Sequence, residues 1–138
     1  MLDPDKSLEL AEQVARAAEN LGIKTALIGA SALAVHGYTR GTDGIDLAAA
    51  VPADLLRQLL GAMRAAGLRA DLRLPDDDDP PGGVLVVWTS EDENGVPTAV
   101  VEVVNFYNPL RPVANPAIEA IARAVDLETL HLRCVALA

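Results

Sequence analysis

The sequence predicts a mixed α/β (α+β) domain in which helices pack mainly on one face of a single β-sheet. Apolar strands alternate with amphipathic helices in the first half of the chain, and two β-rich runs joined by the turn pair Asn94-Gly95 predict a hairpin in the second half. The chain has 138 residues, of which 51% are hydrophobic and 22% charged. This length suits one hydrophobic core and not two, so we expect residues 1–138 to form a single domain.

Periodicity and capping residues place the elements of the first half. Asp3 and Pro4 supply an N-cap and a proline at the first helical position, and apolar residues then recur at helical spacing. A second stripe with this spacing follows Pro52 and stops at Gly67. The elements predicted here are a helix over 4–21, a strand over 23–28, a short helix over 31–36, a strand over 45–51, a helix over 52–66, and a strand over 68–74 whose alternation is typical of a sheet edge.

Turn-forming residues organise the second half of the chain. The segment 75–83 is rich in Asp, Pro and Gly, a composition that predicts a solvated loop. Asn115 and Pro116 are typical of the start of a helix. The elements predicted here are strands over 84–89 and 98–106, a last helix over 116–125 and a closing strand over 130–136.

The charge balance excludes several classes of partner. Eleven Lys and Arg residues against twenty Asp and Glu residues leave a formal net charge of −9. A polyanion or an anionic membrane would be repelled, and one Trp, two Tyr and one Phe are too few for a base-stacking platform. We therefore expect no extended nucleic-acid surface. A small phosphate ligand that arrives with a divalent metal ion remains compatible with this charge.

Hydropathy and cysteine content indicate a cytoplasmic protein. The longest uncharged stretch, 25–39, contains polar residues and falls short of the roughly 18 apolar residues that a membrane span needs. The acidic N-terminus lacks the basic and apolar regions of a signal peptide, and the single Cys134 forms no internal disulfide. We therefore expect no membrane partner.

Two carboxylates inside apolar strands are the main candidates for chemistry. Asp46 lies in the run 45–51 and Glu102 in the run 98–106, and both runs are expected to be central strands buried on both faces. An isolated buried carboxylate costs several kcal/mol unless it is paired, protonated or bound to a cation. Each acid could instead face solvent or pair with an arginine. If the two strands are neighbours, the acids repel each other, and a divalent ion with oxygen ligands would resolve that repulsion.

The turn Gly29-Ala30-Ser31 is the second candidate. It lies between a predicted strand and a predicted helix, so its backbone N–H groups and the helix N-terminus could hold a phosphate, assisted by the Ser31 hydroxyl. Small residues also occur where a strand and a helix simply pack closely. The turn alone leaves both interpretations open.

The stretch from Leu27 to Leu47, LIGASALAVHGYTRGTDGIDL, resembles the signature of the minimal nucleotidyltransferases of the polymerase β superfamily. The similarity is greatest to the abortive-infection toxin type, whose pattern is Gly-Gly-x-Ala-x-x-x-His-Gly-x-x-Arg-x-Thr-x-Asp-Ile-Asp-Leu. The resemblance implies a nucleotidyltransferase fold and Mg²⁺- or Mn²⁺-dependent transfer of a nucleoside monophosphate from a nucleoside triphosphate to a hydroxyl acceptor. In that family the acids of the signature strand are one residue apart, which puts both on one face.

Carried onto this chain, the resemblance assigns roles to six residues. It implies that nucleotide is bound by Gly29, Ala30, Ser31 and Arg40, and that Asp46 and Glu102 serve as metal ligands and catalytic carboxylates. Arg40 would contact a phosphate or steady the acids. The first aspartate of the family falls on Gly44, and the adjacent Asp43 would point to the opposite face unless Gly44 permits a bulge.

Gly44 leads to two alternative expectations for the function of the domain. Loss of one of three metal carboxylates weakens divalent binding and lowers catalysis, so the first expectation is an impaired nucleotidyltransferase with weakly held Mg²⁺. The alternative is a catalytically inactive module for nucleotide sensing or partner binding, in a toxin–antitoxin-like pair or a homo-oligomer. We also expect the domain to lack the C-terminal helices that form the acceptor side in this family, which would leave the acceptor site incomplete unless a partner protein or second copy supplies it.

Overall fold

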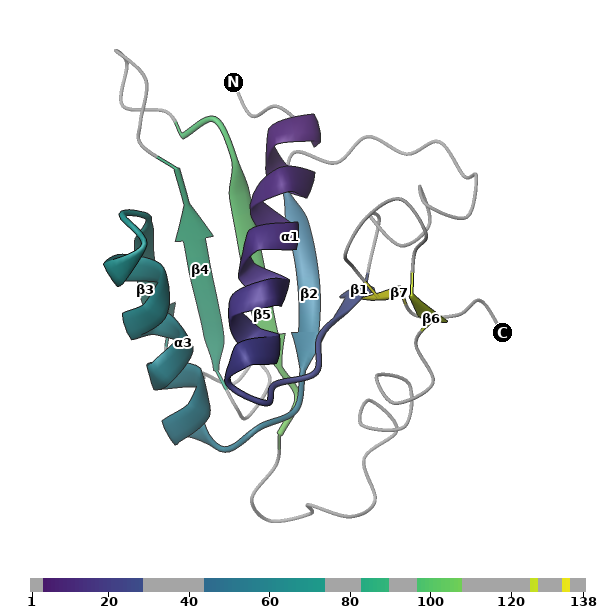
Figure 1. The fold of residues 1–138 in the computed structure, drawn as a ribbon, viewed down its shortest axis with the longest axis vertical. Coiled ribbons are helices and arrows are strands. Elements are labelled where there is room, and N and C mark those ends of the chain that lie inside the picture. The colour runs from purple at the N-terminus through teal and green to yellow at the C-terminus, as the bar shows by residue number, and fades with distance from the viewer. Residues whose placement is uncertain are drawn as a thin grey trace.

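The computed structural model describes residues 4–28, 44–73, 83–89, 97–107, 125–126 and 133–134. The helices are α1 (Pro4–Asn20) and α3 (Ala53–Ala65), and the strands are β1 (Ala26–Ile28), β2 (Ile45–Ala49), β3 (Arg69–Arg73), β4 (Val84–Trp88), β5 (Val100–Asn105), β6 (Val125–Asp126) and β7 (Arg133–Cys134) (Figure 1). The strands form one sheet in the order β3-β4-β5-β2-β1-β7-β6. The mixed α/β class expected from the sequence is thus confirmed.

Parallel and antiparallel pairs both occur in this sheet. Strand β2 runs parallel to β5, with a register that extends from the pair Ile45 and Val101 to the pair Ala49 and Asn105. Strand β1 also runs parallel to β7, whereas the pairs β1·β2, β3·β4, β4·β5 and β6·β7 are antiparallel. The antiparallel pair β4·β5 confirms the strands of the expected hairpin, and β3 lies at the sheet edge where its alternating pattern placed it.

The core lies between the sheet and the two described helices. Helix α1 contacts β2 and β5, helix α3 contacts β3 and β4, and the two helices also contact each other, so both lie on one face of the sheet (Figure 1). Val14 of α1 and Leu56 and Leu59 of α3 are fully buried against the sheet residues Leu47 and Val103. The amphipathic stripes seen in the sequence are therefore the surfaces that close this core.

Both described helices end in the same way. Gly22 and Gly67 adopt positive φ angles of 77° and 86°, which glycine reaches without steric strain because it has no Cβ atom. Beyond the first glycine, the N–H of Ile23 donates to the Ala18 carbonyl at 2.9 Å, and beyond the second, the N–H of Leu68 donates to the Met63 carbonyl at 3.1 Å. These are the backward hydrogen bonds of a Schellman motif, and they satisfy carbonyls that the helix leaves unpaired.

Some sequence expectations need correction. The strand expected over 23–28 begins only at Ala26, because the backbone of Ile23 closes the end of α1. The last helix was expected to reach Val125, but Val125 and Asp126 form β6 and pair with β7. The short helix over 31–36, most of the loop over 75–83 and the Asn94-Gly95 turn lie outside the described residues. Among the helices that the structure describes, none is long and apolar enough to cross a membrane.

Asn105 joins the carboxyl ends of β2 and β5. Its side chain is fully buried: Oδ1 accepts hydrogen bonds from the N–H of Val51 at 3.0 Å and of Tyr107 at 3.2 Å, and Nδ2 donates to the Val51 carbonyl at 2.8 Å. The N–H of Phe106 also donates to the Ala49 carbonyl at 2.8 Å. The amide side chain thus extends the β2·β5 ladder past the last backbone pair.

Replacement of Asn105 by alanine should destabilise the protein strongly. The Asn105→Ala variant leaves the buried N–H and C=O groups of Val51 without these partners, and each unsatisfied group costs about 1–3 kcal/mol. We expect the free energy of unfolding in urea to fall by about 2–4 kcal/mol. The matched change Asn20→Ala, at an exposed position at the end of α1, should cost less than about 0.5 kcal/mol. Similar losses for both variants would contradict this role.

Candidate functional site

Asp46 and Glu102 lie side by side at the centre of the sheet. They are register partners across the parallel pair β2·β5, which occupies the third and fourth places in the strand order. Register partners on neighbouring strands direct their side chains to the same face, with backbones about 4.8 Å apart. Two carboxylates separated by 56 positions in sequence, Asp46 and Glu102, are therefore held as immediate neighbours by backbone hydrogen bonding.

The expectation that these strands are buried on both faces holds only in part, since Ala48, two residues after Asp46 on the same face, is buried. Ile45, Leu47 and Val101 are buried on the side that faces α1 and α3, whereas Asp46 and Glu102 are only half-buried. The reason is the two-residue period of a strand, which turns both acids to the face opposite the described helices. The acids are thus central in the sheet and half-buried.

A row of register partners crosses the sheet at this level. Ile28 of β1 lies next to Asp46, and Val86 of β4 lies next to Glu102, with Asp71 of β3 at the far end of the row. Ile28 and Val86 are half-buried, so each acid has one carboxylate and one aliphatic side chain as its lateral neighbours. The pair of acids thus lies in a partly apolar setting.

This setting destabilises the charged form of Asp46. Burial raises the pKa of the Asp46 carboxyl above its ordinary value of 3.8. Within the described ranges no Lys or Arg side chain forms an ion pair with Asp46 or Glu102, so that part of the structure offers no support for the arginine-paired alternative. The two acids therefore stand next to each other without a described cation.

Gly44, directly before β2, belongs to the same face of the sheet as Asp46. It precedes Asp46 by two residues and lies beside Val100, which precedes Glu102 by two. A Cβ atom at position 44 would come 3.2 Å from the Val100 carbonyl oxygen, so a side chain there requires the two strands to shift by a few tenths of an ångström. Gly44 is not among the glycines with positive φ, so the backbone itself admits other residues.

The remaining predicted site residues are not described. Gly29, Ala30, Ser31, Arg40 and Asp43 all lie outside the described residues, so their predicted roles stay predictions. The chain nonetheless enters the 29–31 segment directly from Ile28, the register partner of Asp46.

The two acids could hold a magnesium ion that takes its other ligands from water and substrate, whereas they are too few for a metal site made only of protein ligands. Across the described ranges, no group of three or more His, Cys, Asp or Glu side chains comes together to hold a metal ion. Mg²⁺ is commonly bound through one or two carboxylates, with waters and substrate phosphates as its other ligands. Neighbouring carboxylates on one face of the sheet match that donor set, and a cation bound there would offset the cost of burying Asp46.

Sequence reasoning missed one residue of this site. Val100 places its carbonyl against Gly44, and nothing in the run around Val100 indicates this, because the contact depends on the register between strands far apart in sequence. No protein-family model matches the chain. No curated protein matches it significantly. The resemblance to the nucleotidyltransferases therefore depends on the residues of the 27–47 stretch and on Glu102.

Neutralising Asp46 should stabilise the protein at neutral pH. Because the folded state raises the carboxyl pKa, it binds the proton more tightly than the unfolded chain, and stability is lost as the pH rises above 3.8. The Asp46→Asn variant does not ionise, so its melting temperature should exceed that of the wild type at pH 7 and equal it near pH 3. A lower melting temperature at pH 7 would contradict this assignment.

The control for this measurement is Asp54→Asn, which makes the same change of charge at an exposed position in the first turn of α3. A carboxylate there favours the helix dipole. The control should therefore leave the melting temperature at pH 7 unchanged or lower it.

Proposed function

We propose that this domain binds a nucleoside triphosphate with Mg²⁺ at Asp46 and Glu102 and transfers its nucleoside monophosphate to a hydroxyl group, at a rate reduced by Gly44. The observation that carries the proposal is the parallel register that makes Asp46 and Glu102 neighbours on one face of the sheet. We also propose that the protein acts in the cytoplasm. The resemblance of the 27–47 stretch to the minimal nucleotidyltransferases supplies the substrate class.

Electrostatics makes a bound cation necessary for nucleotide binding by this domain. The nucleotide carries several negative charges, as does the domain, whose net charge is −9, so the two would repel unless a cation lies between them. When bound, Mg²⁺ would neutralise phosphate charge and polarise the reacting phosphoryl group. Asp46 and Glu102 would hold and orient this ion, and the 29–31 segment and Arg40 would contact the phosphates.

Glu102 is the better placed of the two acids to accept a proton. Its side chain has one more methylene group than that of Asp46 and starts from the same level of the sheet. In the proposed reaction the acceptor hydroxyl oxygen would form a bond to the α-phosphorus of the nucleotide, pyrophosphate would leave, and Glu102 would accept the hydroxyl proton while Asp46 stays ionised as a ligand. This division of roles follows the family in which the later carboxylate activates the acceptor.

Gly44 favours a second candidate function. On this face a carboxylate at position 44 would lie next to Asp46, and the chain has none there. A site with fewer carboxylates holds divalent ions weakly. A catalytically inactive module that senses nucleotide or binds a partner protein, as in a toxin–antitoxin pair, is therefore the alternative that this residue supports.

Calorimetric titration with ATP in the presence of Mg²⁺ tests the binding step. Saturable heat should appear with the wild type, and Asp46→Asn should weaken binding at least about tenfold, because one of two carboxylate ligands is lost. The exposed change Asp54→Asn should leave the affinity unchanged. Absence of heat at millimolar ATP would reject the nucleotide site and favour the partner-binding module.

A carboxylate at position 44 should raise the transfer activity. With radiolabelled nucleoside triphosphates and Mg²⁺, Gly44→Asp should transfer label roughly 100-fold faster than the wild type, since it restores a preorganised charged group. Gly44→Ala introduces the same close Cβ contact with the Val100 carbonyl but no charge, and it should give no gain. Equal label transfer by all three proteins would show that the metal site is elsewhere.

A further inference from the structure

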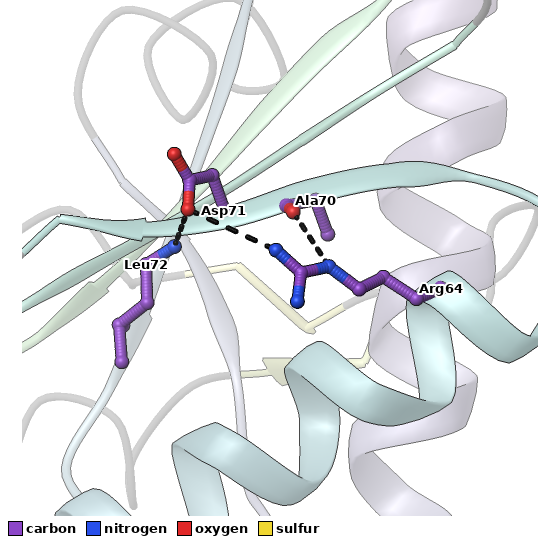
Figure 2. A network of polar contacts seen from close by, with 4 residues as sticks. All are labelled: Arg64, Ala70, Asp71 and Leu72. Carbon is purple, nitrogen blue, oxygen red and sulfur yellow. Dashed lines mark hydrogen bonds and ion pairs between the residues drawn. The ribbon is translucent and has the colours of Figure 1, made fainter.

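The outer edge of the sheet at β3 is covered by side chains. Arg64 reaches from α3, and its Nε donates a hydrogen bond to the Ala70 carbonyl at 3.0 Å (Figure 2). Asp71 Oδ1 accepts a hydrogen bond from the N–H of Leu72 at 3.0 Å and lies 3.9 Å from Arg64 Nη2. In the described part of the chain β3 pairs with β4 on one side only, so these groups occupy the backbone of its other side.

The same two contacts identify which backbone groups face outward. In an antiparallel pair, the N–H and C=O of one residue point the same way, and the direction alternates along the strand. Because the Ala70 carbonyl and the Leu72 N–H both meet side chains, Ala70 and Leu72 are the residues that present their backbone at the open edge. An open edge of this kind is a template for a further strand.

Stability alone does not account for this arrangement. The side chains of Arg64 and Asp71 are 57% and 76% exposed, and a pair this exposed contributes little to folding. The hydrogen bond from Arg64 satisfies the Ala70 carbonyl, which is part-buried in a residue only 6% exposed. In addition, the Arg64 guanidinium occupies the β3 edge with a bulky charged group.

The exposed face of β3 is complementary to itself in two registers, centred on Ala70 or on Leu72; in the second, Asp71 stands opposite Arg73, which is exposed on the same face. Arg69 and Asp71 are both exposed and lie two residues apart, on the same face. If β3 of a second copy pairs antiparallel with Ala70 opposite Ala70, each Arg69 stands opposite the Asp71 of the other copy. A shift that centres the pair on Asp71 would instead place Asp71 opposite Asp71. Opposite charges at cross-strand positions stabilise a pair and like charges destabilise it.

Arg64 competes for the two groups that this pairing needs. The Ala70 carbonyl would accept from the Ala70 N–H of the second copy, and Asp71 would pair with its Arg69, but both groups now contact Arg64. The two-fold axis of such a pair is perpendicular to the sheet. Both α3 helices would thus lie on one side, with their Arg64 side chains near the axis, where their like charges repel.

We infer that Arg64 gates self-association of this protein: while its guanidinium holds the Ala70 carbonyl the β3 edge stays closed, and its withdrawal lets β3 of a second copy add antiparallel, centred on Ala70. The partner is a second copy of this chain, and the product is a symmetric dimer with one sheet continuous across both copies. The charges of Arg69 and Asp71 disfavour a pair centred on Asp71, and the second experiment below separates the Ala70 register from the Leu72 register.

The first experiment removes the gate. Arg64→Met keeps a long side chain and deletes the charged donor, and it should strengthen dimerisation at least about tenfold relative to the wild type, since the competing hydrogen bond from a charged group is lost. Sedimentation velocity across a concentration series measures the dissociation constant. Arg57→Met, an exposed change on the same helix, should leave it unchanged. Circular dichroism checks that each variant is folded.

The second experiment tests the register by exchanging charges. In the Arg64→Met background, Asp71→Arg places Arg opposite Arg, and Arg69→Asp places Asp opposite Asp, so each variant alone should be monomeric. An equal mixture of the two restores both opposite-charge pairs and should form a heterodimer. An Arg64→Met variant that remains monomeric or forms polydisperse aggregates would overturn the gate. An Arg69→Asp variant that dimerises alone would overturn the Ala70 register, because a pair centred on Leu72 keeps Asp71 opposite Arg73.

Discussion

The parallel hydrogen-bonded ladder between β2 and β5 is the constraint on which the rest of the structure depends. It joins strands from the two halves of the chain at the centre of the sheet and sets which residues face each other. One face of this pair carries Leu47 and Val103 into the core, and the other carries Asp46 and Glu102. A slip of one residue would bury the acids and expose the core residues, so hydrophobic burial fixes the position of the acids.

The ionised carboxylate of Asp46 is a cost to folding that the rest of the sheet offsets. Burial raises the pKa of Asp46, which means that the ionised form weakens the folded state at neutral pH. The fully buried aliphatic core and the Asn105 hydrogen bonds at the end of the ladder stabilise the same two strands. A group retained against stability, next to a second carboxylate on the same face of the sheet, is the kind of arrangement that binding sites use. This balance underlies the proposed cation and nucleotide site.

The central strands and the edge strand of this sheet expose different kinds of chemical group. The central strands present their chemistry on a face, where the register of neighbouring strands sets the spacing of side chains. The edge strand β3 presents backbone groups instead, and Arg64 and Asp71 occupy them from the side. The two features occupy different parts of the sheet, since β4 lies between the edge strand β3 and the β5·β2 pair that carries the acids. Self-association and ligand binding can therefore be separated by mutation.

The sequence by itself determined the class of fold, the bounds of α1 and α3 to within a residue or two and the edge character of β3, because helical spacing, glycine termination and strand alternation are local properties. It also singled out Asp46 and Glu102 as acids within apolar strands. It overestimated their burial and extended a helix through Val125, because burial and short strand pairings depend on neighbours distant in the chain. Only the tertiary structure decided that the two acids adjoin, that Val100 crowds Gly44 and that Arg64 reaches the β3 edge, since register and interelement contacts arise when separate segments pack together.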